Sequence, residues 1–401
     1  MALEATTGKG RLAIVGGRVL PIEGTPFEGG AILIEDGRIT ALGPDIPVPD
    51  GVDRIDADGK VVLPGLVDAH AHVGVHEEAE GWAGQDTNEL TNPVTPQVRA
   101  LDAINPDDLG FEDAISGGVL TVNVNPGSGN PIGGQTVALR CAGRTVDEMV
   151  LRAPSGLKSA LGENPKRVYG ERKEYPSTRL GTAAVIRESF VKAANYLDKH
   201  ERGGNNGEPV ERDLRWEALA LVLRREIPWR QHCHRADDIA TALRLADEFG
   251  YRLVIDHGTE AALLADRIAE RGVPVLIGPL LTSRSKVELR RRSLANPGKL
   301  AAAGVEIGII TDHPVVPIHL LHVQAALAVK EGLDPETALR AVTLTPARVL
   351  GVDDQLGSLA PGKAASLCIW SGDPLDVRSR VEAAWIDGRQ VLRPEAEGSA
   401  A

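Results

Sequence analysis

The central part of the chain, residues 65–350, alternates short apolar runs with segments of helical pattern. The runs GVLTVNV, RLVIDHG, VPVLIGP and VEIGIIT are apolar on both faces, which indicates strands buried on both sides. Strands that alternate with helices along one chain favour a parallel βα architecture, because each helix carries the chain back to the start of the next strand. We therefore predict an α/β fold, a (β/α)₈ TIM-like barrel, with a doubly wound sheet as the alternative.

The helical segments carry recognisable ends. RADDIATALRLADEFG has an acid near its start and Gly250 as a predicted stop. The later segment DPETALRAVTLTPARVLG begins with Asp334, a predicted N-cap, followed by Pro335 in the first turn. These signals place helices between the predicted strands.

Two stretches of a different pattern flank the barrel, residues 1–64 and 351–401. The sequences IEDGRITAL and IDGRQVL each place an Asp-Gly turn between β-rich runs, which is typical of hairpins. Because both ends share this pattern, we expect them to meet in one small sheet domain around the barrel of residues 65–350.

Composition excludes several classes of partner. The net charge of −12 over 401 residues comes without a compensating basic block, which argues against nucleic acid and anionic membranes. The sequence contains neither a signal-peptide pattern at its start nor an apolar run of the ~18 residues that a membrane span requires. Three cysteines without CxxC spacing suit a reducing compartment, so we expect a cytoplasmic protein.

Metal-ligating side chains recur at the ends of predicted barrel strands. They occur in LVDAHAH, WRQHCH, RLVIDHG and IGIITDH and are His70, His72, His232, His234, His257 and Asp312. The carboxyl ends of parallel barrel strands meet at one rim, so these side chains should converge. Imidazole nitrogen and carboxylate oxygen are ligands that Zn²⁺ accepts, and alternate residues of His-x-His share one face of a strand. The pattern predicts a metal site, with Asp68 as an orienting partner of the ligands.

The same motifs resemble the metal-dependent amidohydrolase superfamily. The resemblance covers nearly the whole chain and rests on His-x-His after PGLVD, single histidines on two later strands and an aspartate at a late strand end. GSLAPGKAASLCIW is similar to the family's return into a β-sandwich built from both termini, although Ala364 and Ser366 replace acids that are common there. The resemblance implies one or two divalent metal ions per chain, with zinc as the expected metal.

It also implies roles for individual residues. His70, His72 and Asp312 would bind the more buried metal, and His232 with His257 a second one, with His234 as the competitor for the His232 role. A bridging ligand would come from SGLKSALGENPKRVYG. For this ligand we prefer Glu163, which stands at an apparent strand end, and keep Lys158 and Asn164 as alternatives.

The chemistry implied by the resemblance is hydrolysis of a C–N bond by metal-activated water. Asp312 would move the proton, so Asp312 and His257 are the predicted catalytic residues. The predicted substrate contacts are His234, Arg284, His313 and Tyr169. A deaminase is disfavoured, because the position of its proton-shuttling glutamate holds Arg235 or Asp237. A metal-free scaffold homologue is disfavoured because all the expected ligands are present.

The resemblance is closest to the imidazolonepropionase and dipeptidase-like branch. That branch acts on small cyclic amides, dipeptides and N-acyl compounds, and it includes tailoring enzymes that remove a follower peptide in bottromycin-type biosynthesis. We therefore expect a small-molecule or short-peptide substrate, either in peptide tailoring or in catabolism. We also expect a homo-oligomer.

Overall fold

A sheet of eight strands forms the centre of the molecule. The computed structural model describes residues 10–201, 203 and 211–393. The sheet has the order β15-β14-β13-β12-β11-β10-β9-β8 and curves into a nearly closed barrel. Its strands are β8 (Leu66–Ala71), β9 (Val119–Val124), β10 (Ile132–Arg140), β11 (Val150–Ala160), β12 (Trp229–Cys233), β13 (Leu253–His257), β14 (Val275–Ile277) and β15 (Ile307–Ile309). The predicted barrel is confirmed.

The edge strands β8 and β15 approach each other at the carboxyl end of the barrel. There the Asp312 amide donates to the His70 carbonyl over 3.1 Å, and the His72 amide donates to the His313 carbonyl over 3.0 Å. These two bonds bring the first and last segments of the barrel together, and with them two groups of predicted ligands.

One strand departs from the parallel arrangement. Strand β10 is antiparallel to both β9 and β11, whereas the other neighbouring pairs of the barrel sheet are parallel. The segments that join β10 to its neighbours contain only the short helix α2 (Val146–Met149). Antiparallel strands can be joined by short connections, whereas a parallel pair needs a crossover of a dozen or more residues, so β10 had to reverse direction.

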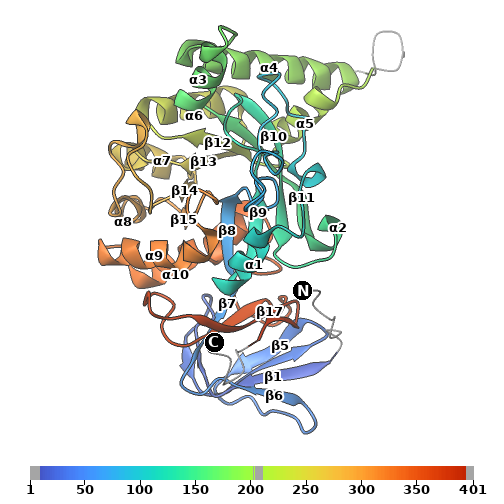
Figure 1. The fold of residues 1–401 in the computed structure, drawn as a ribbon, viewed down its shortest axis with the longest axis vertical. Helices are drawn as coiled ribbons and strands as arrows, with labels where there is room; N and C mark the ends of the chain where they lie inside the picture. Colours follow the sequence, from blue (N-terminus) through green and yellow to red (C-terminus); the bar gives the residue numbers. More distant parts are fainter. Residues whose placement is uncertain (1–9, 202, 204–210, 394–401) are drawn as a thin grey trace.

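Helices surround the barrel (Figure 1). The further helices of the described residues are α1 (Leu109–Ser116), α3 (Glu163–Glu171), α4 (Arg179–Glu201), α5 (Leu214–Leu223), α6 (Ala236–Phe249), α7 (Ala265–Glu270), α8 (Asn296–Ala302), α9 (Leu321–Lys330), α10 (Pro335–Ala341) and α11 (Leu344–Leu350). No helix in this part of the chain combines the length and the apolar character needed to cross a membrane.

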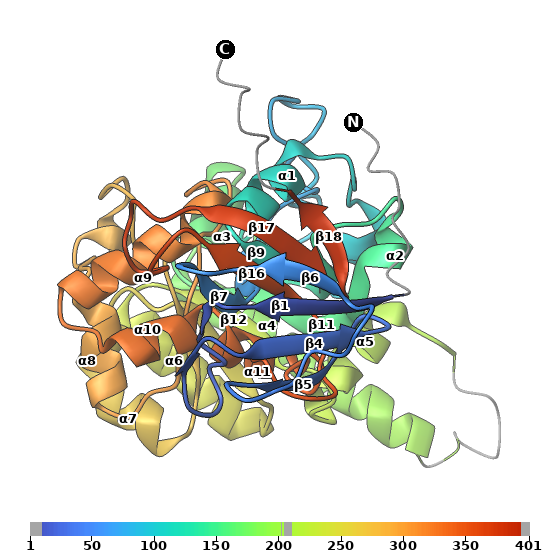
Figure 2. The same ribbon diagram turned by 90° about the horizontal axis from the view of Figure 1, so that it is seen from below.

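Two further sheets lie below the barrel and combine both ends of the chain (Figure 2). They have the orders β5-β4-β1-β6 and β18-β17-β16-β7-β2-β3. Their strands are β1 (Arg11–Val15), β2 (Arg18–Val19), β3 (Phe27–Glu28), β4 (Ala31–Glu35), β5 (Arg38–Gly43), β6 (Asp53–Asp56), β7 (Val61–Pro64), β16 (Leu367–Trp370), β17 (Val381–Ile386) and β18 (Arg389–Leu392).

The two lower sheets share a core of their own. Ile14 and Ile32 of the four-stranded sheet are fully or almost fully buried in one cluster with Val62, Leu367 and Trp385 of the six-stranded sheet. In the six-stranded sheet, β7 pairs antiparallel with β16, so the two ends of the chain hydrogen-bond directly. We predicted one domain from residues 1–64 and 351–401 and a barrel domain from residues 65–350. These domain bounds stay a prediction.

Candidate metal centre

One group of potential metal ligands comes from the two edges of the barrel sheet. The ligand atoms of His70, His72 and Asp312 lie within 4.8 Å of one another. The Asp312 Oδ1 atom is 3.3 Å from Nε2 of both histidines. His70 is in β8, His72 follows that strand, and Asp312 follows β15. The closure of the barrel therefore creates this first cluster.

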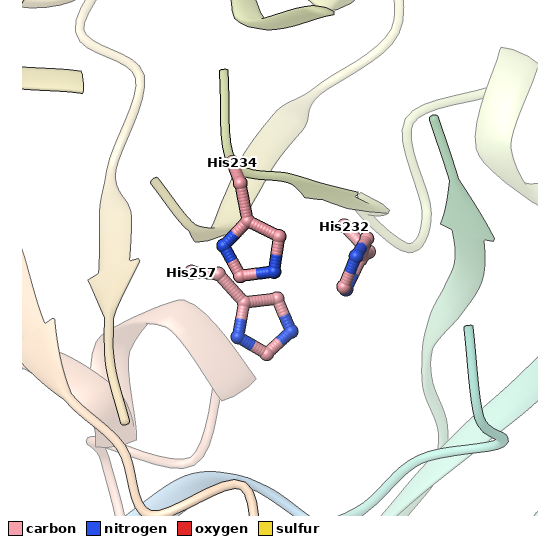
Figure 3. Close-up of side chains that lie close together, drawn as sticks. All are labelled: His232, His234 and His257. Atoms are coloured by element: carbon pink, nitrogen blue, oxygen red, sulfur yellow. The ribbon is translucent and has the colours of Figure 1, made fainter. Parts of the chain in front are cut away.

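A second group comes from the neighbouring strands β12 and β13. His232, His234 and His257 are buried, and their ligand atoms also lie within 4.8 Å of one another. Figure 3 shows the three imidazole rings facing a common space. The structure thus places both His232 and His234 beside His257, so both histidines are candidate ligands in the second cluster.

The two clusters adjoin. The ring centroids of His70 and His257, one from each cluster, are 4.7 Å apart. Lys158 of β11 is 1% exposed in its side chain, and its Nζ atom lies 2.9 Å from His70 Nε2. Lys158 therefore contacts His70, the ring of the first cluster that adjoins the second cluster.

Polar contacts at Nδ1 orient four of the histidines. The Nδ1 atom of His72 lies 2.8 Å from the Asn125 carbonyl oxygen, and that of His257 lies 2.9 Å from the Gly278 carbonyl oxygen. Because a carbonyl can only accept, Nδ1 carries the proton in both rings and the Nε2 lone pair stays free.

The other two contacts involve a carboxylate and a hydroxyl group. His70 Nδ1 is 3.2 Å from an oxygen of Asp256, and His234 Nδ1 is 2.8 Å from the Thr259 hydroxyl. Protein metal sites hold their histidines by such Nδ1 contacts, which fix the orientation of the ring and its tautomer.

Burial favours the neutral form of the histidines. It lowers the pKa of His70, and burial together with the charge of Lys158 keeps that ring unprotonated at neutral pH. Burial, followed by the charge of Lys286, lowers the pKa of His234 to about 3. The pKa values of His232 and His257 are also well below the usual range, chiefly through burial. Neutral imidazole is the metal-binding form.

Asp312 is ionised for a different reason. Its burial opposes ionisation, but the adjacent imidazoles of His257, His70 and His72 outweigh that effect, so its pKa is well below the usual range. Asp312 also has a φ of 54°, and His257 has a φ of 73°. A left-handed backbone costs a residue with a side chain about 1–2 kcal/mol, so the surrounding fold holds both ligands in strained positions.

A second layer of charged groups lies beneath the clusters. Asp256 accepts hydrogen bonds from Arg230 Nε and a terminal nitrogen of the same guanidinium, over 3.1 and 2.8 Å, and both residues are fully buried. Burial alone would raise the pKa of Asp256, but Arg230 and His70 lower it. Asp256 therefore stays charged, and its contact with His70 Nδ1 holds that ring in place.

Asp68 connects the two edges of the barrel instead of touching an imidazole ring. Its carboxylate accepts from the amides of His70 and Thr311, each over 3.1 Å, and from the Thr311 hydroxyl. Burial raises its pKa to about 7. Asp68 thus fixes the backbone that carries His70 and, one residue after Thr311, Asp312.

The residues considered for the bridging role lie at different places. Neither cluster includes Glu163, which is the first residue of α3, half-buried, with its amide bonded to Glu288. Asn164 lies beside the second cluster, with Nδ2 3.4 Å from His232 Nε2. Lys158 is the one in contact with His70. The geometry at β11 thus favours Lys158.

Three predicted substrate contacts lie outside both clusters. Arg284 is exposed and donates to the carbonyl groups of Arg290 and Arg292. Tyr169 is fully buried, and its hydroxyl donates to Asn130 Oδ1 over 2.6 Å. His313 is also fully buried, with Nε2 3.4 Å from Glu78 and Nδ1 accepting from the Ile318 amide.

The donor set fits a divalent metal. It consists of neutral histidines and one carboxylate, which are ligands that zinc and similar ions accept. His232 Nδ1 is buried and has no hydrogen-bond partner among the described residues, an arrangement that costs free energy unless another group binds there. The two clusters can therefore hold one metal each.

A barrel with these ligands at the carboxyl ends of its strands defines the class of metal-dependent hydrolases. The family model described as "Amidohydrolase family" matches residues 189–392, just over half of the chain. A crystal structure of an amidohydrolase from Thermotoga maritima MSB8 is 47% identical, with a TM-score of 0.92, covering 95% of this chain and 100% of that chain. The chain belongs to the amidohydrolase family.

Curated relatives agree with this assignment. Amidohydrolase tasK of Hapsidospora irregularis is 31% identical over 90% of this chain, which spans 39% of that longer protein. The imidazolonepropionase of Mesorhizobium japonicum (strain LMG 29417 / CECT 9101 / MAFF 303099) is 27% identical over 86% of both chains. The protein is thus a hydrolase acting on C–N bonds, in a family whose members generally use divalent metals.

Proposed function

We propose that this protein hydrolyses an amide bond of a small substrate with the help of divalent metal, most simply zinc, held by the two histidine clusters. The observation that carries the proposal is the pair of adjoining clusters, with Lys158 in contact with His70 and Asp312 facing both His70 and His72. A bound metal would polarise the substrate carbonyl and activate water.

Asp312 is the residue we propose for proton transfer. Its low pKa keeps it ionised at neutral pH, so it can accept a proton from the attacking water and donate it to the leaving nitrogen. The histidines of the second cluster, fixed by the contacts at His234 and His257, would hold their metal without taking part in that transfer.

We propose Lys158, rather than Glu163, as the group that joins the two metal positions. Burial lowers the pKa of Lys158 to about 8, so its amine loses a proton more readily than an exposed lysine does. The neutral amine can form a carbamate with carbon dioxide: a new C–N bond forms, a proton leaves, and the product carries two oxygen ligands.

The substrate class is the finer part of the proposal. The imidazolonepropionase relatives match this chain over 86% or more of both lengths, which supports a small cyclic amide. A dipeptide or an N-acyl amino acid contains the same kind of bond and is the other substrate class that we propose. Removal of a follower peptide is the same reaction on a peptide substrate and stays a prediction.

The first prediction concerns Asp312→Asn. We expect this variant to fold and to lose roughly 10²–10⁴-fold in turnover, because the amide cannot accept the proton. The measurement is hydrolysis of a panel of cyclic amides, dipeptides, N-acyl amino acids and peptides by zinc-loaded protein, with product analysis for the new carboxylate and amine.

Asp147→Asn is the matched control, because Asp147 is exposed on α2, outside both clusters. It should keep the wild-type rate. Hydrolysis that persists in metal-stripped Asp312→Asn protein would refute the proposal.

A further inference from the structure

We infer that Lys286 recognises a carboxylate of the substrate on the side of the second cluster. This inference rests on the proposed function and narrows its substrates to acidic ones, such as an N-acyl amino acid or a dipeptide with a free carboxyl terminus. Lys286 immediately precedes the short 3₁₀ helix η4 (Val287–Leu289), in the segment that follows β14.

Two hydrogen bonds connect the Lys286 ammonium to the metal ligands. Its Nζ atom donates to Asn164 Oδ1 over 2.8 Å. The amide nitrogen of Asn164 lies 3.4 Å from His232 Nε2 and donates to the Ser128 hydroxyl over 2.7 Å. Asn164 is 8% exposed, so burial and these hydrogen bonds hold its amide in place between the Lys286 ammonium and the histidines.

No carboxylate of the described residues neutralises the positive charge of Lys286. Among the described residues, no carboxylate lies within ion-pair distance of its Nζ atom, whereas the nearby Asp238 and Glu288 are both engaged by Arg179, over 3.1 and 2.8 Å. Its contact with Asn164, which in turn lies 3.4 Å from His232 Nε2, places this charge beside the second cluster.

A cation that repels the positive charge of a metal site is unfavourable unless an anion comes between them. A substrate carboxylate would fill that role, since the ammonium is half-buried and still has two N–H groups besides the one used by Asn164. The amide bond of such a substrate would then extend from the carboxylate toward the two clusters.

Arg284, one of the predicted substrate contacts, is less suited to bind a carboxylate. Its guanidinium donates to two backbone carbonyl groups of its own loop, and the side chain is exposed. The ammonium two residues later is the one that points toward Asn164.

Binding of N-acetyl-L-alanine and of its neutral carboxamide to the zinc-loaded protein tests the inference. We expect wild type to bind the acid more tightly than the carboxamide, and Lys286→Met to weaken binding of the acid roughly 10–100-fold while changing binding of the carboxamide little. Lys286→Arg should recover most of the loss. Lys166→Met, which removes a lysine from the exposed side of α3, is the matched control and should bind as wild type does.

The outcomes separate this inference from the proposed function, because binding is read by titration calorimetry without turnover. Equal weakening of both probes would mean that Lys286 only holds Asn164 in place, and the inference would be overturned. A wild type that does not prefer the acid would overturn it too. Preferential binding of the acid, lost in Lys286→Met, in a protein that cleaves no amide would support Lys286 and contradict the proposed function instead.

Discussion

Lys158 is a buried amine whose nearest partner is the metal-facing nitrogen of His70. An unmodified ammonium at this place repels a metal ion, whereas its carbamate would attract one. We therefore propose that this residue determines how many metals the centre can hold.

This reasoning gives a prediction for metal content. Lys158→Ala should lose roughly half or more of the zinc that wild type binds, because the bridging ligand is gone. Glu163→Gln should bind as much zinc as wild type, since neither cluster includes Glu163. Zinc is measured per chain after dialysis, in buffers with and without bicarbonate. Loss of zinc from Glu163→Gln with full retention by Lys158→Ala would reverse our assignment.

The sequence predicted that most of these side chains converge, and it kept Lys158 only as an alternative to Glu163. Histidines at strand ends could be expected to converge, because all parallel strands of a barrel end at one rim. The choice between Lys158 and Glu163 depended on which side chain faces the clusters near the end of β11, and the turn signal in GENP does not reveal that. In the structure β11 ends at Ala160, and Gly162, with a φ of 92°, turns the chain so that Glu163 begins a helix.

Asp256 and Arg230 illustrate a second limit. Neighbouring residues on a regular strand point to opposite sides, so a strand on which His257 faces the site does not predict that Asp256 faces it too. The left-handed backbone of His257 breaks that alternation, so both side chains reach the clusters. The position of Asp256 directly before His257 in RLVIDHG was the only sequence signal for its place near the clusters. For Arg230, two residues before His232, the signal was the shared face of the strand.

At the level of elements, local rules predicted the ends of helices and hairpins well. Asp334 caps α10 by accepting from the Thr337 amide, and Gly250 ends α6 in a left-handed conformation, both as predicted. The two Asp-Gly turns adopt positive φ at both residues, 48° and 79° at Asp36-Gly37. This is the type I′ geometry that suits a two-residue hairpin. The reversal of β10 was not predictable in the same way, because it depends on the whole barrel.

The cap of α10 gives a prediction about stability. Asp334→Ala should lower the free energy of unfolding by about 1 kcal/mol, because the first turn loses its hydrogen-bond acceptor. Asp334→Asn should lose less, since an amide oxygen also caps helices. The hydrogen bond from the Thr337 amide lowers the pKa of Asp334. Its contribution is therefore present at neutral pH and lost as the pH falls below about 4.

Urea denaturation of the three proteins at neutral pH and at low pH measures this contribution. The difference between wild type and Asp334→Ala should shrink in acid. A difference that stays constant down to the acid range would contradict the role of the charged cap.

At the scale of the whole molecule, the three cysteines report on the integrity of the cores. Cys141, Cys233 and Cys368 are 2%, 0% and 0% exposed, and burial raises the pKa of each thiol. We expect all three to react with a disulfide reagent at pH 8 at least roughly 100-fold more slowly in the native protein than in guanidinium, because reaction requires opening of the core. One thiol that reacts as fast as in the unfolded chain would contradict the packing described around it.

The pairing of β7 with β16 has a consequence for how the chain is made. The ribosome releases Val61–Pro64 long before its partner Leu367–Trp370, and the separation of roughly 300 residues takes about 15–60 s at typical translation speeds. During that interval β2 and β3 can add to one edge of β7, while the other edge waits without its partner. The barrel segment is thus synthesised after β7 and before β16. The six-stranded sheet is complete only when β16, β17 and β18 have emerged.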